Sequence, residues 1–307
     1  MDASSYSRRM LQYVRERHPR SLAGVLEARA VDPRRFDEYA ALFVGWATSA
    51  YGEDVIERMV DAFVLFSSDV NLAQARYEAT GRYERLTYKE SDDAVYSQPG
   101  VMRDYLLGVY LTNFMWAHHM ELSLLFEDRF LPSIAGESRI IEIAPGHGGW
   151  GLWALHATRG TSLVGFDISD TAVDMARQLA SAAQLSARAS YAQRDAMSIT
   201  TDIGPVYDAC ICSFLIEHLE DPGALLALVS RLVRPTARVF LTGALTAAQV
   251  DHVYEFRHEA ELVVLAEQHG FRVLDMRSVG PRRTLPGARF LPRSAALILQ
   301  KRTHETW

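Results

Sequence analysis

The chain has few of the features that mark secreted or disulfide-stabilised proteins. Its 307 residues include two cysteines, Cys210 and Cys212, which lie in one apolar run. Alternate residues of a strand share a face, and a flat strand seldom allows a disulfide between them. The pair also lacks neighbouring ligands for a metal. We therefore expect two packed thiols in a reducing compartment.

Long hydrophobic runs are missing as well. No run reaches the roughly 18 apolar residues that a membrane-spanning helix requires, and the first ten residues, M-D-A-S-S-Y-S-R-R-M, contain no apolar signal core. These absences predict a cytoplasmic protein with no membrane partner.

An excess of positive charge is missing too. The chain has 32 basic and 38 acidic residues, a net charge of −6, and its basic residues are scattered along the sequence. Nucleic-acid binding proteins usually gather basic residues on one surface, so we expect no nucleic-acid partner. Hydrophobic residues make up 49% and charged residues 23%, which is typical of a soluble globular protein. The length allows one large domain or two modest ones.

Residues 1 to about 135 have the periodicity of helices. Apolar residues recur at helical spacing after Asp32-Pro33, a capping residue followed by a first-turn proline. A second helix begins near Gly52 and ends near Gly81, and a long helix is expected from about Val101 to Phe130. We expect this region to form a helical cap that helps to enclose a substrate or mediates oligomerisation.

Residues 82–100 interrupt that helical pattern. This stretch mixes charges, tyrosines and a Pro-Gly turn, which indicates a connecting loop. Loops of this length often have a function, so a lid over a pocket and a plain surface linker are both open interpretations.

From Arg139 the pattern changes to that of an α/β protein. Short β-rich runs at 139–143, 162–166, 207–213 and 237–242 alternate with helical stretches, which predicts a parallel sheet built from βαβ units. Two further β-rich runs, 271–279 and 295–300, follow near the end of the chain.

A glycine-rich turn follows the first of these strands. The run R-I-I-E-I-A-P-G-H-G-G-W-G has Gly146, Gly148 and Gly151 in the spacing of a dinucleotide fingerprint, and Asp167 follows Gly146 by 21 positions. The glycines alone do not determine the cofactor. Glu142, at the end of the strand, would repel a pyrophosphate but attract a cofactor that carries an ammonium and a sulfonium. Charge therefore disfavours a nicotinamide dinucleotide.

Several motifs in residues 135–300 resemble those of the class I S-adenosylmethionine-dependent methyltransferases. E-I-A-P-G-H-G is similar to the family's first motif, which implies that Glu142, Gly146 and Gly148 hold the amino-acid part of the cofactor. Ala144 stands where the family usually has its first glycine. G-F-D-I-S resembles the second motif, in which Asp167 would accept both ribose hydroxyls and Ile168 would flank the adenine.

The later motifs extend this resemblance. Q-R-D-A-M resembles the loop after strand three and implies that Asp195 and the backbone of Ala196 contact the adenine. Y-D-A-C-I-C-S-F-L-I-E-H-L-E-D-P resembles the strand-four motif, so Ser213 and Phe214 would line the methyl-transfer site. Thr236-Ala237 replaces a Gly-Gly pair that is common before strand five.

The resemblance implies a fold and a reaction. The expected fold is α/β, with a Rossmann-like, seven-stranded, mostly parallel sheet that ends in an antiparallel terminal hairpin. Residues 136–307 would form this methyltransferase domain, and residues 1–135 the helical cap. The implied reaction transfers a methyl group from S-adenosylmethionine to O, N or C of a small molecule and leaves S-adenosylhomocysteine. Specialised metabolism is the setting considered for this reaction.

His218 is the leading candidate for a general base. It follows strand four, near the expected methyl group, and an imidazole with an ordinary pKa of about 6.5 can accept a proton at neutral pH. The structural alternative is that His218 only orients the loop after strand four, and one histidine in a sequence does not decide between the two.

Residues that would contact the acceptor are expected on two segments. On the long helix, Tyr110, Asn113 and His119 are candidates, although aromatic residues at helical spacing more often belong to the core. After strand five, His252 and Tyr254 lie in a stretch rich in polar groups. His252 with Glu255 and His258 could gather a metal, but a solvated helix start is the favoured interpretation, and no metal is predicted.

Two other functions remain open at this point. A nicotinamide-dependent oxidoreductase would need a catalytic pair such as Tyr-Lys after strand five, and none stands out. A protein that binds the cofactor without transferring a methyl group, as a regulator or partner subunit, is also compatible with an intact glycine loop. The expected partner is a small-molecule acceptor. A homodimer is the assembly considered, and no motif in the sequence establishes it.

Overall fold

A computed structural model of the chain describes residues 4–84, 87–134, 136–199, 205–283 and 287–303. Residue 135, at the predicted domain boundary, lies outside the described residues, as do the first three residues and residues 85–86 of the predicted loop. Among the described helices, none combines the length and the apolar character that a membrane span requires.

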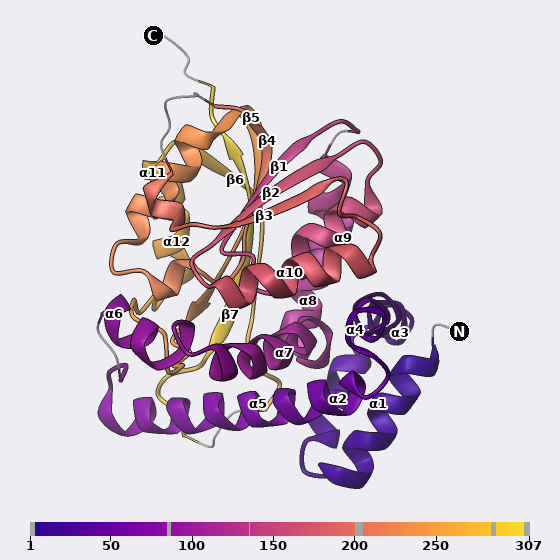
Figure 1. Cartoon of the computed structure of the whole chain (residues 1–307). Helices are drawn as coiled ribbons and strands as arrows, with labels where there is room; N and C mark the ends of the chain where they lie inside the picture. Colours follow the sequence, from indigo (N-terminus) through magenta and orange to yellow (C-terminus); the bar gives the residue numbers. More distant parts are fainter. Residues whose placement is uncertain (1–3, 85–86, 135, 200–204, 284–286, 304–307) are drawn as a thin grey trace.

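The centre of the molecule is a seven-stranded sheet in the order β3-β2-β1-β4-β5-β7-β6 (Figure 1). Strands β1 to β5 are parallel, and β7 is antiparallel to both of its neighbours. The predicted α/β fold, including its terminal antiparallel hairpin, is confirmed. The strands are β1 (Arg139–Ile143), β2 (Ser162–Asp167), β3 (Ala189–Gln193), β4 (Tyr207–Cys212), β5 (Val233–Leu245), β6 (Phe271–Val279) and β7 (Arg293–Lys301).

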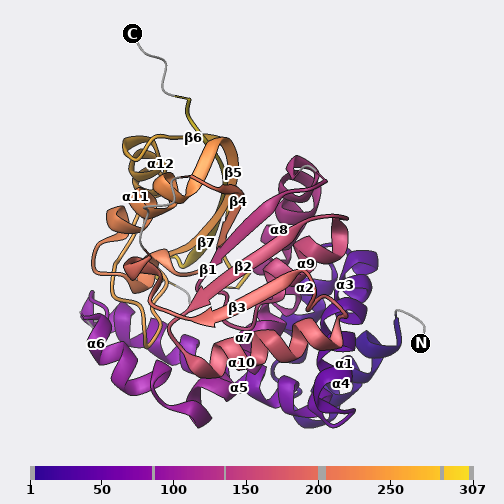
Figure 2. The ribbon, with the colours of Figure 1, turned by 45° about the horizontal axis from the view of Figure 1, so that its top comes forward.

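Helices cover both faces of this sheet, as Figures 1 and 2 show. On one face lie α9 (Gly149–Ala157) and α10 (Asp170–Ala182), and on the other lie α11 (Pro222–Leu232) and α12 (Glu259–Gln268). Because successive strand residues point to opposite faces, Ile140 belongs to the first core, and Ile141 and Ile143 belong to the second. Cys210 and Cys212 are both buried and free in the second core, which confirms the expected packed thiols.

The N-terminal region is helical, as predicted. The caps expected from sequence are present: Asp32 accepts a hydrogen bond from the Arg35 amide, and Gly81 ends α5 at a φ of 73°. The helices are α1 (Ser4–Arg17), α2 (Leu22–Arg29), α3 (Pro33–Tyr39), a π-helical turn (Ala40–Val44), α4 (Gly45–Tyr51) and α5 (Val55–Thr80).

The expected single helix over 101–130 is wrong. The chain forms α7 (Pro99–Met115), turns at Trp116, and continues as α8 (Ala117–Leu125), a π-helical turn (Phe126–Phe130) and a 3-10 turn (Leu131–Ser133). Trp116 has extended backbone angles, φ −99° and ψ 129°. Its ring stacks on Phe66, and its Nε1 donates to the Ser67 hydroxyl, so contacts with α5 hold the break in place.

The predicted loop over 82–100 contains helical structure. Its described part includes α6 (Tyr88–Ser91) and a π-helical turn (Asp92–Tyr96). Ser91 and Val95 are buried, and the Ser91 hydroxyl donates to the Asp251 carbonyl oxygen. The segment is therefore packed against the loop after β5, and α5, α6 and α7 together lie across the carboxyl ends of the parallel strands (Figure 1).

Candidate active site

The strand order reverses between β1 and β4, and open α/β sheets usually bind nucleotides at such a point. A cavity of about 150 Å³ lies there, beyond the carboxyl ends of the strands. Its lining includes seven of the predicted cofactor residues and two other predicted residues: Glu142, Ala144, Gly146, Asp167, Ile168, Ser213, Phe214, Asn113 and His218. Sequence segments far apart in the chain are thus brought together as expected.

The Glu142 carboxyl group is buried at the end of this cavity. Its Oε1 accepts from the Gly151 amide at 3.1 Å, whereas Oε2 has no hydrogen-bond partner among the described residues. Burial raises the pKa of Glu142 to about 8, and the nearby Asp167 adds to the increase. A Cβ atom at position 151 would overlap Oε2, so a glycine is needed there. A cationic group in the cavity would stabilise the carboxylate, which matches the ammonium of S-adenosylmethionine.

Asp167 lies at the end of β2 with both oxygens anchored. Oδ2 accepts from the Gly146 amide and Oδ1 from the Ser169 amide, each at 2.9 Å. Burial raises the pKa of this carboxyl group, while those amides oppose the increase. A carboxylate oxygen has two lone pairs, so each can still accept from a ribose hydroxyl. Because the side chain is held in one orientation, it can receive a vicinal diol without further ordering.

The glycine loop adopts left-handed backbone angles. Ala144, Gly146 and Gly148 have φ values of 51°, 54° and 73°, a region that favours glycine. Gly148 lies outside the cavity lining and precedes α9 as its N-cap. A Cβ atom there would approach the Cβ of Ala176 to 2.9 Å. Gly148 therefore shapes the loop, and its predicted contact with the cofactor stays a prediction.

Asp195 and Ala196 are placed differently from the other predicted cofactor residues. Neither belongs to the lining of the described cavities. Asp195 caps a short 3-10 helix (Ala196–Ser198), with its Oδ1 accepting from the Met197 amide at 2.8 Å. Their adenine contacts stay a prediction.

A larger cavity of about 430 Å³ adjoins the first. Tyr105, Val109, Thr112, Phe214 and His218 line both cavities. The larger one is bordered mainly by α5, the α7–α8 break and the loop after β5, and its lining includes the aromatic residues Phe63, Phe66, Trp116, His118 and His119. Because the aromatic cavity opens beside the cofactor cavity, it is the natural place for a second, largely apolar molecule.

His218 lies where the two cavities meet. Its Nδ1 is 3.0 Å from the Asp251 carbonyl oxygen and 2.9 Å from the Tyr96 hydroxyl, and that hydroxyl donates to Asp251 Oδ2 at 3.1 Å. A carbonyl oxygen can only accept, so this arrangement favours the tautomer with the proton on Nδ1. Nε2 is then left with a free lone pair, which suits a base or a metal ligand.

Three of the predicted acceptor residues line the cavities. His119 stacks on Phe214 at 4.7 Å between ring centroids, and its nitrogens contact the hydroxyls of Thr112 and Ser294. Burial lowers the pKa of His119, so the ring is neutral. Asn113 lines the smaller cavity, and His252 lines the larger one.

The other two predicted acceptor residues lie elsewhere. Tyr110 is fully buried in the core, where its hydroxyl donates to the Phe43 carbonyl oxygen. The face of α7 that carries it meets the N-terminal helices instead of the cavity. Tyr254 packs beside Phe256 and belongs to neither lining, because the chain turns away from the cavity after His252. The expected contacts of these two tyrosines are not supported by their positions.

The metal set considered from sequence does not assemble. Glu255 pairs with the Tyr77 hydroxyl and with Arg257, and His258 caps the start of α12, where its amide donates to Glu261. His252 lies instead beside Glu217 and His218. Sequence reasoning did not name Tyr96 or Gln249 as site residues, and it placed Asp251 only within the polar stretch after strand five. The only sequence signal for these residues is the density of polar groups in residues 82–100 and in the stretch after β5.

Residues 140–236 match a family model described as a methyltransferase domain. This part of the chain is therefore similar to methyltransferase domains. The curated relatives include ubiquinone biosynthesis O-methyltransferases. That of Aeromonas salmonicida is 32% identical over 34% of this chain and 42% of its own length, and that of Coxiella burnetii is 26% identical over 44% and 64%. The chain therefore spans less than two thirds of these relatives.

Solved structures support the fold of this methyltransferase domain. The phospholethanolamine N-methyltransferase 2 of Haemonchus contortus aligns with a TM-score of 0.53 and 14% identity, over 72% of this chain and 61% of its own. The [4+2]-cyclase SpnF aligns with a TM-score of 0.51 and 16% identity, over 61% and 83%. Because a cyclase is among the neighbours, the fold alone does not determine the reaction. None of these comparisons favours the oxidoreductase alternative.

Proposed function

We propose that the chain is an S-adenosylmethionine-dependent methyltransferase that methylates O, N or C of a small molecule. The observation that carries this proposal is the pair of adjoining cavities, one with Glu142 and Asp167 at its base and the other lined by aromatic rings. A donor in the first and an acceptor in the second would meet beside Phe214 and His218. S-adenosylhomocysteine would be the product.

The protein's first contribution to this reaction is positioning. S-adenosylmethionine supplies an activated methyl group on a sulfonium. Glu142 would hold its ammonium and Asp167 its ribose, while the aromatic walls orient the acceptor and exclude water. Holding two reactants in line can supply roughly 7–11 kcal/mol of the barrier. The methyl-transfer site would lie near Phe214, whose ring is fixed against His119.

His218 is the proposed catalytic residue. It lines both cavities, and the contacts of Nδ1 with Asp251 and Tyr96 hold the imidazole in one orientation. We propose that His218 governs the loss of the acceptor's proton. An acceptor without a proton to lose would need only positioning.

The acceptor class follows from the larger cavity. Its walls include the stacked rings of Phe66, Trp116 and His118, which favour a planar, aromatic molecule. The curated relatives are named O-methyltransferases, so a phenolic oxygen is the first acceptor atom to test. The proposed location is the cytoplasm, where the two free thiols would stay reduced.

The test is methyl transfer from S-adenosylmethionine with a labelled methyl group to a panel of phenols, aromatic amines and carbon acids. We expect label in at least one acceptor with one S-adenosylhomocysteine formed per transfer. Asp167→Asn should reduce transfer at least tenfold, while Asp174→Asn, an exposed acid on α10, should leave it unchanged. Tight cofactor binding without transfer to any acceptor would favour the non-catalytic partner protein instead.

A further inference from the structure

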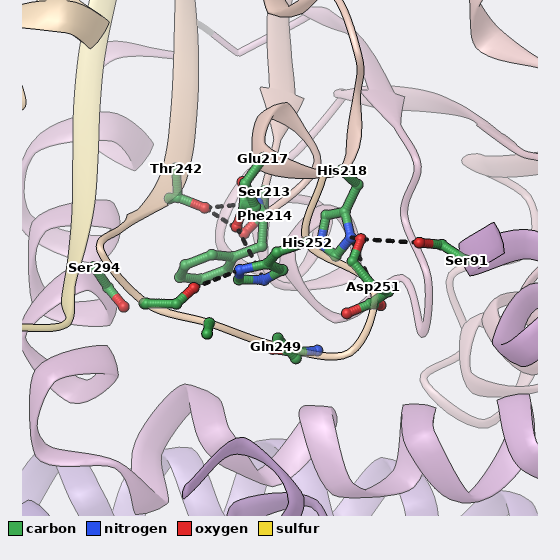
Figure 3. Close-up of polar contacts among 12 residues, drawn as sticks. Ser91, Ser213, Phe214, Glu217, His218, Thr242, Gln249, Asp251, His252 and Ser294 are labelled. Atoms are coloured by element: carbon green, nitrogen blue, oxygen red, sulfur yellow. Dashed lines mark hydrogen bonds and ion pairs between the residues drawn. The ribbon is translucent and has the colours of Figure 1, made fainter. Parts of the chain in front are cut away.

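Glu217, His218 and His252 form a buried cluster at the edge of the larger cavity. Each residue offers one ligand atom, and the three atoms lie within 4.8 Å of one another. Glu217 is 0% exposed, His218 7% and His252 5%. Figure 3 shows the three side chains gathered beside Phe214 and Thr242, at the carboxyl ends of β4 and β5. All three residues also line the cavity, so a molecule inside it can reach the cluster.

The Glu217 carboxyl group lacks the partners that a buried acid normally has. Neither Oε1 nor Oε2 accepts a hydrogen bond from any described residue, and His252 Nε2 lies 4.0 Å from Oε1. A buried carboxylate without a partner is costly, often by several kcal/mol. Burial therefore favours the protonated acid in the absence of a cation, and a cation shared with the two imidazoles would stabilise the carboxylate.

Each histidine is oriented as a metal ligand usually is. His252 Nδ1 lies 2.7 Å from the Ala247 carbonyl oxygen, and His218 Nδ1 lies 3.0 Å from the Asp251 carbonyl oxygen. A carbonyl beside Nδ1 fixes the proton there and leaves the lone pair of Nε2 for an ion. The cluster thus offers two imidazole rings and one carboxyl group as ligands.

We propose that Glu217, His218 and His252 bind a divalent transition-metal ion, of the kind represented by Zn²⁺, Fe²⁺ or Co²⁺, at the edge of the acceptor cavity. Two imidazoles and a carboxylate suit these ions and not Mg²⁺ or Ca²⁺, which prefer oxygen ligands. Ligand atoms about 2.1 Å from one ion lie roughly 3.0–3.5 Å apart. Binding therefore requires the three side chains to close in by about an ångström.

As a ligand of the ion, His218 would help to activate the acceptor's oxygen. This part of the inference rests on the proposed methyl transfer. A three-residue site leaves a position open for the acceptor's oxygen, and a bound ion lowers the pKa of such an oxygen. The acceptor O–H proton would be lost to water as the acceptor binds to the ion. The oxygen then attacks the methyl carbon, a C–O bond forms, the C–S bond breaks, and its electron pair goes to sulfur. The substrate class is accordingly a hydroxylated aromatic molecule.

Metal binding is tested on the full-length protein after EDTA treatment and buffer exchange. Titration with Co²⁺ should give visible d–d absorption that saturates at one ion per chain, and Mg²⁺ should give no calorimetric binding. His252→Ala should weaken Co²⁺ binding by more than about 100-fold. Glu217→Gln, which keeps the side-chain size, should weaken it as well. His258→Ala, outside the cluster, should bind as the unchanged protein does.

Two results would overturn the site. One is the absence of saturable Co²⁺ absorption in the unchanged protein, and the other is equal affinity in His252→Ala, Glu217→Gln and His258→Ala. Circular dichroism of each variant confirms that it is folded. Methyl transfer is measured separately. Full methyl transfer by the protein after EDTA treatment would overturn the role of the ion but not the methyltransferase proposal. Binding of one Co²⁺ per chain without methyl transfer would support the metal site and contradict the proposed methyltransferase activity.

Discussion

Glu142 shows how a single residue links the cofactor cavity to protein stability. Its pKa is raised to about 8 by burial, against an ordinary value of 4.5. The folded protein without cofactor therefore keeps a proton that the unfolded chain loses above pH 4.5. The resulting stabilisation is complete below pH 4.5 and disappears as pH rises toward 8.

The prediction for Glu142→Gln follows from this sign. The amide cannot titrate, so the free energy of unfolding of the variant should improve relative to the unchanged protein by up to roughly 1.4 kcal/mol per pH unit between pH 5 and 8. Urea unfolding at pH 5, 6.5 and 8, with Glu38→Gln as an exposed control, measures this slope. If the free energy of unfolding changes with pH equally in Glu142→Gln and in the unchanged protein, the raised pKa of Glu142 is contradicted.

Thr236 is a residue whose backbone conformation does not suit its side chain. It is exposed and has a φ of 68°, where the family commonly has glycine. Thr236→Gly should raise the free energy of unfolding by about 0.5–1 kcal/mol, because glycine adopts this conformation without strain. Thr158→Gly, at a φ of −121°, should lower it. Urea unfolding of both variants checks the signs, and destabilisation by Thr236→Gly would refute the argument.

Sequence alone predicted the residues whose roles depend on a local motif. Glu142 and Asp167 each end a strand, and strand ends meet at one edge of a parallel sheet, so their proximity followed from the fold. The Glu217 cluster did not follow in this way. Its partner His252 is 35 positions further along, and only the path of the loop after β5 brings the two together.

At the scale of elements, the break between α7 and α8 shapes the acceptor cavity. Sequence periodicity continues through Trp116, and no glycine or proline lies between Val109 and Phe130, which is why a single helix was predicted. Two contacts with α5 stabilise the break: the ring of Trp116 stacks on Phe66, and its Nε1 donates to the Ser67 hydroxyl. Contacts between segments far apart in the chain cannot be read from the periodicity of one segment. The same limitation misplaced Tyr110, since a helix with two apolar faces does not reveal which one meets the cavity.

Trp116→Ala should therefore weaken binding of the acceptor and leave binding of the cofactor unchanged. We expect the free energy of unfolding to fall by about 3 kcal/mol, as for other large-to-small changes at packed aromatic residues. The KM for the acceptor should rise at least tenfold, while the affinity for S-adenosylmethionine changes less than twofold, because Trp116 lines only the larger cavity. Trp116→Phe, which keeps a ring for the stack, is the matched control. An equal loss of cofactor affinity would contradict the assignment of the two cavities.

At the scale of the whole molecule, the N-terminal helices and one face of the sheet share a core. Phe43 contacts Trp153 of α9 at 5.6 Å, and Phe130 contacts Phe240 of β5 at 5.5 Å, both between ring centroids. These residues belong to one continuous cluster. Sequence predicted two regions from a change in periodicity, but periodicity does not report how closely two regions are packed.

A chain restricted to residues 136–307 should consequently fail to fold cooperatively. Removal of the helices would expose the apolar surface of α9 and α10 to water, and burial of such surface contributes roughly 25 cal/mol per Å². We expect weak near-ultraviolet circular dichroism and no sharp thermal transition for this fragment. A cooperative transition together with binding of S-adenosylmethionine would show instead that the residues form an independent domain.

The most direct test of the whole account is calorimetric titration with S-adenosylmethionine, S-adenosylhomocysteine and NAD. We predict one-site, micromolar binding of the first two by the unchanged protein, loss of that binding in Asp167→Ala, and no binding of NAD. Binding of NAD in place of S-adenosylmethionine would contradict the methyltransferase assignment and the role given to Glu142.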